Sequence, residues 1–207
     1  SLVLSAEEKR ATAIHEGGHA ILTVVLPNSD PLHKVTILPR GMALGLTWSL
    51  PEERHTYSKE YFDDMICRAM GGRVAEKIVF GHLNSGAAND LEQATSIARR
   101  MVREWGMSEA IGPMAWSGSQ QVFLGEDLMT QGREYSDETA KLVDSEIFRI
   151  LHEQEARATE VLLKYRPALE LVAEALLERE TIDGAEVAQL VQASLDHVQV
   201  TEDAHIE

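Results

Sequence analysis

The feature that most constrains the fold of this chain is the run His15-Glu16-Gly17-Gly18-His19 within an Ala-rich stretch. Side chains four residues apart on an α-helix lie on one face, so the two imidazoles can bind one tetrahedral Zn²⁺. Glu16 projects to the side of this pair, where a carboxylate can take a proton from a zinc-bound water. The spacing predicts a helix that carries two zinc ligands, His15 and His19, and a catalytic base, Glu16.

The residues around this run are typical of a helix over 5–26. Ser5 and Glu8 fit a capping box, and apolar residues recur at helical spacing at Ala11, Ile14, Ala20, Ile21, Val24 and Val25. Gly17 and Gly18 each cost roughly 1 kcal/mol relative to alanine in a helix interior. A closely packed backbone and an open substrate channel would both explain why the helix contains them.

A catalytic zinc ion needs a third protein ligand, with water in the fourth position. The metzincin pattern is excluded by Leu22 and Val25, and the absence of any acid in residues 34–51 argues against a thermolysin-like glutamate. Asp90 is a better candidate, since it lies in or near the first turn of a predicted helix. An acid there is also explained by the helix dipole alone, so the spacing leaves both roles of Asp90 open.

Several longer blocks carry a family resemblance. HEGGHA, LHKVTILPRG, ALGLTWSLPEE, GGRVAEKIVFG, SGAANDLEQAT and ARRMVREWGMSEAIGP follow one another over residues 8–113. They resemble the peptidase domain of FtsH-type membrane-anchored AAA+ metalloproteases, and the resemblance continues more weakly to about residue 193. The family usually has alanine where this chain has Gly17. The resemblance implies that His15, His19 and Asp90 bind one Zn²⁺ per chain and that Glu16 is the base.

The resemblance also implies a larger assembly. It implies unfolded or membrane polypeptides as substrates, an AAA+ ATPase module in cis, and a homohexamer formed through the helical half. It places the full-length protein at a membrane, with this domain on the cytoplasmic side in bacteria or its organelle-interior equivalent. The chain contains no GxxxxGK[ST] loop and no apolar run near the roughly 18 residues of a membrane span. We therefore expect a peptidase fragment that is itself soluble.

Two other functions are compatible with the residues. A free-standing zinc peptidase for small peptides would need no ATPase module. A non-catalytic, zinc-stabilised assembly module is disfavoured by Glu16, because a structural zinc site is normally closed by four protein ligands and needs no base. The net charge of −15 argues against nucleic-acid binding. The single cysteine, Cys67, excludes an intrachain disulfide and is expected to be buried.

Residues 34–38 and 43–49 alternate apolar and polar side chains around a turn, which predicts a hairpin or paired strands. Strand edges can bind an extended peptide by strand addition, and the resemblance implies an edge strand here. The predicted substrate-binding residues are Thr36, Ile37, Leu38, Gly45, Leu46 and Thr47. A purely structural hairpin is the alternative.

A further helix is predicted from Ser58 to about Val79, interrupted at Gly71-Gly72. Glu76 on this helix is a candidate carboxylate for anchoring the second ring nitrogen of a zinc-bound histidine. A backbone carbonyl in that role, with Glu76 exposed, is equally compatible with the sequence.

The fold class that follows is mainly α-helical with a small β-sheet or hairpin (α+β), built on a zincin-type HExxH helix. We expect one peptidase domain over 1–193, with a metal-site half (1–110) and a helical half (136–193). Residues 112–134 are predicted to form a short hairpin and a mobile loop. Helices are predicted from Ser136 to about Tyr165, over 169–177 and over 185–195, and residues 194–207 are expected to be a disordered acidic tail.

Overall fold

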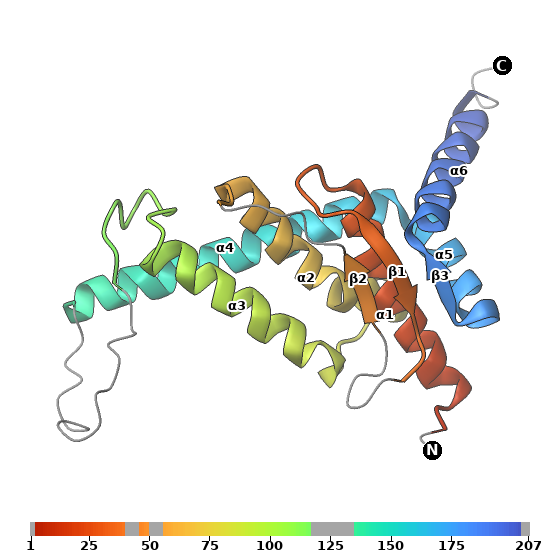
Figure 1. Ribbon diagram of the computed structural model, residues 1–207, viewed down its shortest axis with the longest axis horizontal. Helices are drawn as coiled ribbons and strands as arrows, with labels where there is room; N and C mark the ends of the chain where they lie inside the picture. Colours follow the sequence, from red (N-terminus) through yellow and green to blue (C-terminus); the bar gives the residue numbers. More distant parts are fainter. Residues whose placement is uncertain (1–2, 40–45, 50–55, 117–134, 204–207) are drawn as a thin grey trace.

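The computed structural model describes residues 3–39, 46–49, 56–116 and 135–203 of the chain, and these form mostly helices with one small sheet (Figure 1). The predicted class, mainly α-helical with a small β-sheet, is confirmed. In chain order the elements are α1 (Ala6–Val25), β1 (Leu32–Thr36), β2 (Leu46–Ser49), α2 (Lys59–Phe80), the short 3-10 helix η1 (Ser85–Ala87), α3 (Ala88–Arg103), α4 (Asp137–Lys164), α5 (Arg166–Arg179), β3 (Thr181–Asp183) and α6 (Gly184–Asp203).

Helix α1 begins at the predicted capping box. The Ser5 hydroxyl accepts from the Glu8 N–H at 3.2 Å, and the Glu8 carboxylate accepts from the Ser5 N–H at 2.8 Å. The glycines of α1 allow two close approaches. A Cβ built on Gly18 would overlap the backbone of Gly71 in α2, and one on Gly17 would lie 3.3 Å from Leu169 in α5. A closely packed backbone therefore explains Gly18, whereas the atom nearest to a Cβ on Gly17 is the end of the Leu169 side chain.

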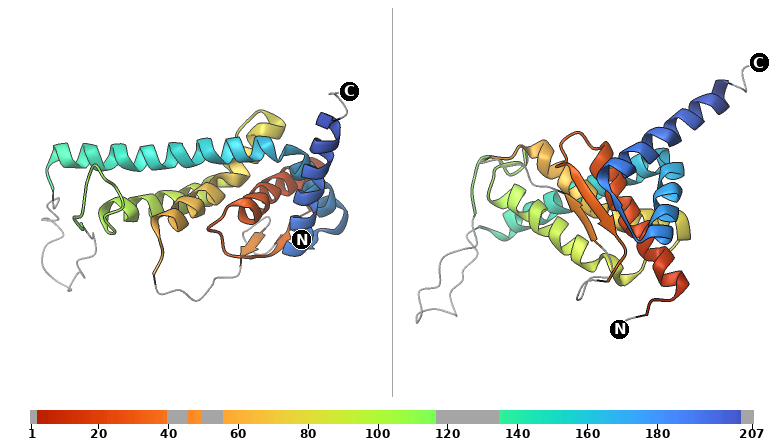
Figure 2. Two further views of the ribbon diagram at one scale, coloured as in Figure 1. Left: turned by 90° about the horizontal axis from the view of Figure 1, so that it is seen from above. Right: turned by 45° about the vertical axis from the view of Figure 1, so that its right-hand side comes forward.

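Helix α2 differs from the prediction, because it continues through Gly71-Gly72 without interruption. The packing of these glycines against α1 offsets their poor helix propensity, which a reading of local sequence does not capture. Gly81, with φ 76°, ends the helix in the left-handed conformation that glycine adopts readily. Cys67 lies in α2 and is fully buried, as expected. Figure 2 shows the long helix α4 running beside α2 and α3.

The sheet has three strands in the order β2-β1-β3. The sequence predicts a hairpin or paired strands here, and β1 and β2 do pair, in the antiparallel direction, with Thr36 opposite Leu46. The pairing of β1 with β3, in which Thr36 lies opposite Thr181, was not predicted. Strand β1 is therefore central, and β3 lies on the side of β1 that faces α5 and α6 (Figure 1).

Helices α4, α5 and α6 contain most of residues 136–193, where helices are predicted. Helix α6 continues to Asp203, so the expected disordered tail is wrong for residues 194–203, which are helical. Residues 204–207 and 117–134, which include most of the expected loop, lie outside the described residues. Among the described helices, none combines the length and the apolar character needed to span a bilayer.

Candidate metal centre

Side-chain atoms of His15 and His19 in α1 and of Asp90 in α3 lie close together. His15 Nε2 lies 3.0 Å from Asp90 Oδ2, His19 Nε2 lies 3.2 Å from the same oxygen, and the two histidine nitrogens are 3.1 Å apart. Ligands bound at about 2.0–2.1 Å in a tetrahedron are about 3.3 Å from one another. The triangle of two nitrogens and one carboxylate oxygen therefore fits zinc. Among the described residues, His15, His19 and Asp90 form the group of potential ligands whose side-chain atoms are close enough together to hold a metal ion.

Local structure explains how the three residues converge. His15 and His19 are one turn apart on α1, so their side chains share a face. Asp90 lies in the first turn of α3, where the helix dipole favours a carboxylate. The structure thus places Asp90 beside both histidines. The helix dipole favours a carboxylate at this position, and the same carboxylate can also bind a metal ion, so the two roles of Asp90 do not exclude each other.

Helix α2 lies beside the Nδ1 atoms of both imidazoles. His19 Nδ1 lies 2.7 Å from the carbonyl oxygen of Arg68, so this nitrogen carries the proton and donates it. His15 Nδ1 lies 3.5 Å from the carboxylate of Glu76, which is buried. Hydrogen bonds of this kind fix the ring orientation and leave Nε2 free to bind a metal. The structure thus places the buried Glu76 beside His15 and a backbone carbonyl beside His19, and the anchoring role of Glu76 stays a prediction.

The electrostatics of the site favour a cation. Burial disfavours the imidazolium form of His15, but its contacts with Asp90 and Glu76 and the charge of Glu16 raise its pKa to about 10. Burial also opposes ionisation of Asp90, but hydrogen bonds from His15 and His19 hold the pKa of its carboxyl below its usual range. In the metal-free protein a proton supplies the positive charge, and a divalent cation can replace it.

Glu16, the predicted base, is buried at 7 % exposure beside the two histidines in α1. Its charge acts on His15, as the pKa of that residue shows. The carboxylate therefore lies within the electrostatic reach of the metal centre, in a setting that shields it from bulk water.

The residues predicted to bind substrate are Thr36, Ile37, Leu38, Gly45, Leu46 and Thr47, and those that the structure describes lie in or next to the sheet. Strand β1 is paired on both sides, and the carbonyl of Glu180 accepts from the Thr36 hydroxyl at 3.2 Å and the Ile37 N–H at 2.9 Å. Leu38 is 39 % exposed. Leu46 and Thr47 lie in the edge strand β2, and Gly45 lies outside the described residues. A substrate-binding role for all six stays a prediction.

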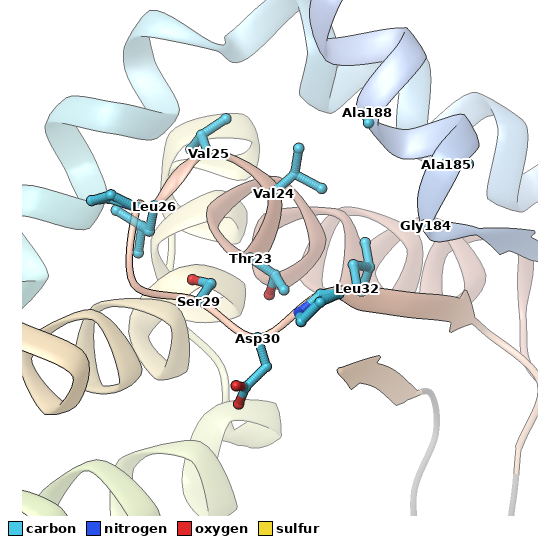
Figure 3. Close-up of a pocket in the computed structure, with 12 residues that line it drawn as sticks. Thr23, Val24, Val25, Leu26, Ser29, Asp30, Leu32, Gly184, Ala185 and Ala188 are labelled. Atoms are coloured by element: carbon cyan, nitrogen blue, oxygen red, sulfur yellow. The ribbon is translucent and has the colours of Figure 1, made fainter. Parts of the chain in front are cut away.

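A pocket of about 510 Å³ lies elsewhere, between the end of α1, the loop that follows it and the start of α6 (Figure 3). Val24, Leu32 and Ala185 are among its lining residues, and it includes none of the residues predicted for the metal centre. The cavity is therefore separate from the proposed chemistry.

Two contributors to the metal centre were not found from the sequence. The carbonyl of Arg68 is a backbone group, which no residue pattern identifies. Gly72 lies against the His15 ring, where a Cβ would overlap the imidazole. The only sequence signal for Gly72 was the glycine pair within a helical pattern, and it was interpreted as an interruption.

Comparison with known proteins agrees with this geometry. The model of Peptidase family M41 matches residues 2–190. The chain is 61% identical over 196 residues to the ATP-dependent zinc metalloprotease FtsH of Acidimicrobium ferrooxidans, covering 94% of this chain and 30% of that protein. It is 49% identical over 197 residues to FtsH 3 of Symbiobacterium thermophilum (94% and 31%) and 45% identical over 201 residues to FtsH of Thermotoga maritima (96% and 33%).

The chain thus spans about a third of the length of the curated relatives it matches. The family resemblance predicted from the sequence blocks is confirmed over most of the chain. On these matches, the chain belongs to peptidase family M41.

Proposed function

We propose that this chain is a zinc-dependent metalloendopeptidase module that hydrolyses peptide bonds of unfolded polypeptides. The observation that carries the proposal is the triangle formed by His15 Nε2, His19 Nε2 and Asp90 Oδ2, with sides of 3.0–3.2 Å. Three protein ligands leave a fourth position open, as in catalytic zinc sites. The FtsH relatives are named as zinc metalloproteases, which supports the choice of metal.

Zinc at this site would supply a Lewis acid that lowers the pKa of a bound water and polarises the scissile carbonyl. Glu16 is the general base: it accepts the proton of the attacking water and then delivers it to the leaving amine nitrogen. Arg68 and Glu76 hold His19 and His15 in the orientation that presents their Nε2 atoms.

Substrate binding by strand addition is part of the proposal. An extended polypeptide can pair with an exposed strand through its backbone, which suits unfolded substrates of varied sequence. Because β1 is already paired on both sides, the edge proposed for substrate is β2, with Leu46 and Thr47. Leu38, exposed just beyond β1, is a candidate contact for a substrate side chain.

For the whole protein we propose an ATP-dependent quality-control protease. The relatives are named ATP-dependent, which supports an AAA+ ATPase module in cis, acting on unfolded or membrane polypeptides. By resemblance, the assembly is a homohexamer anchored in a membrane, with this domain on the cytoplasmic side in bacteria or its organelle-interior equivalent. Without its ATPase, the chain should cleave only short or already unfolded polypeptides.

The test is hydrolysis of a quenched-fluorescence peptide and of an unfolded protein by the wild-type chain and Glu16→Gln. The substitution keeps the size of the side chain and removes the base, so cleavage should fall by about 10²–10⁴-fold. Zinc content, measured by mass spectrometry, should not change. Glu7→Gln, at an exposed position in the first turn of α1, is the matched control and should cleave normally. Full activity of Glu16→Gln would contradict the proposal.

A further inference from the structure

Helix α2 presents three residues, spaced one turn apart, to the histidines of α1. The Arg68 carbonyl holds His19 Nδ1 at 2.7 Å, and the Glu76 carboxylate lies 3.5 Å from His15 Nδ1. Gly72 lies between them, four residues from each, and therefore on the same face. A Cβ built on Gly72 would overlap the Cε1, Nε2 and Nδ1 atoms of the His15 ring.

We propose that Gly72 is a positioning residue of the metal centre: its missing side chain leaves the space that the His15 imidazole occupies. The inference rests on the proposed zinc-peptidase function. In that space the ring lies between α2 and Asp90, with Nδ1 toward Glu76 and Nε2 toward the other two ligand atoms. Any side chain at position 72 would push the ring away from this orientation.

The neighbouring glycines act differently. A Cβ on Gly18 would meet the carbonyl of Gly71 and lie 2.6 Å from the Ala75 Cβ, so α1 and α2 would have to separate. At Gly72 the obstructing atoms belong to the end of a side chain, which can rotate about its own bonds. The Gly18–Gly71 contact therefore serves the packing of the two helices, whereas Gly72 serves the position of one ring.

Helix propensity offers no reason for glycine at position 72. Glycine is among the least favourable residues in a helix interior, and α2 continues through this position with helical geometry. An alanine there would favour the helix if the imidazole were absent. The chain therefore accepts a less stable helix at the point where the His15 ring needs room.

The first test is the zinc affinity of Gly72→Ala, measured by competition with a chromophoric chelator. Because the displaced His15 ring no longer points at the other ligands, zinc should bind at least about tenfold more weakly, the size of effect expected when ligand orientation is lost. Far-UV circular dichroism should show unchanged helix content. Wild-type zinc affinity in Gly72→Ala would overturn the proposal.

The second test needs no metal. The melting temperature in EDTA is compared for the wild type, Gly72→Ala, His15→Ala and the double variant. With the ring removed, Gly72→Ala should raise the melting temperature, because alanine favours the helix. With the ring present, the overlap should cancel or reverse this gain. Equal shifts in both backgrounds would show that Gly72 and His15 do not interact, and would overturn the proposal.

The two tests separate the possible failures. A wild-type chain that binds no zinc would overturn the proposed peptidase function, whatever the melting temperatures show. Equal melting shifts together with normal zinc binding would overturn the role of Gly72 and leave the peptidase proposal in place.

Discussion

At the scale of single residues, Glu180 has a backbone conformation that is costly for its residue type. With φ 65° and ψ −26°, it ends α5 in the left-handed region, which costs a residue with a Cβ about 1 kcal/mol or more. This geometry lets its N–H donate to the Leu176 carbonyl and its own carbonyl accept from Ile37. Glu180 thereby joins the end of α5 to the end of β1.

We expect Glu180→Gly to stabilise the chain by about 0.5–1 kcal/mol, because glycine adopts this conformation without strain. The ion pair with Lys9, at 3.5 Å, is more than 40% exposed on both sides and contributes little. The melting temperature should rise by about 2–4 °C per kcal/mol for a chain of this size. Glu180→Ala is the control, since it removes the ion pair and keeps the strain. An equal rise in the control would contradict this explanation.

At the scale of the elements, the sequence predicted those whose signals are local. The capping residues Ser5, Ser58 and Ser136 correctly marked the starts of α1, α2 and α4. Strand β3 was missed because a three-residue strand has no detectable periodicity and forms only by pairing with β1. The continuity of α2 through its glycines was missed for a related reason, since it depends on contacts with α1.

The candidate site likewise combines residues with local sequence signals and residues that depend on contacts between helices. His15, Glu16 and His19 could be proposed from their spacing alone, because one helix turn determines their geometry. Asp90 comes from another helix, and spacing could not choose between its two roles; the family resemblance made the choice. The part played by the Arg68 carbonyl depends on how α2 crosses α1, which no local pattern encodes.

One buried carboxylate, that of Asp64 in α2, links this helix to α4 and to the loop after α1. The Asp64 side chain is 2% exposed and accepts from Arg157 Nη1 at 2.5 Å. It also accepts from the backbone N–H and the side-chain amide of Asn28, at 2.8 and 3.1 Å. Three segments distant in sequence therefore meet at Asp64, and they include α2, which lies beside both histidine rings.

We expect Asp64→Ala to lower the free energy of unfolding by about 2–4 kcal/mol, because it removes the buried carboxylate that accepts from Arg157 and from the partly buried N–H and side-chain amide of Asn28. Urea unfolding followed by circular dichroism measures this loss. Asp63→Ala is the matched control, since the neighbouring Asp63 pairs with Lys59 at the surface, and such pairs contribute at most about 1 kcal/mol. A similar decrease in the free energy of unfolding in the two variants would show that the contacts of Asp64 do not link these segments.

At the scale of the whole molecule, the proposed metal centre brings together segments that are far apart in the chain. His15 and Asp90 are separated by 75 positions, and the anchoring carbonyl of Arg68 lies on a third segment. A ligand that binds only the folded state stabilises it, by about 4 kcal/mol at a thousandfold excess over its dissociation constant. Zinc should therefore act on the stability of the whole chain as well as on its chemistry.

The size of this stabilisation should depend on pH. In the metal-free protein His15, whose pKa is raised to about 10, contributes stability that is complete below its unfolded pKa of about 6.5. That contribution is lost as the pH rises through about 10. Zinc binding shows the opposite trend, because its ligands must be deprotonated. The gap in melting temperature between zinc-loaded and EDTA-treated protein should therefore widen from about pH 6 to about pH 9.

Thermal unfolding in zinc and in EDTA across this pH range measures the gap directly. Asp90→Ala is the control: it removes one ligand and the hydrogen-bond partner of both histidines, so its gap should be small at every pH. Its metal-free form should also lose less stability than the wild type between about pH 6.5 and about pH 10, because the pKa of His15 would be raised less. A gap that narrows with rising pH in the wild type would mean that protons and zinc do not compete for His15. The description of a protonated His15 in the metal-free site would then be wrong.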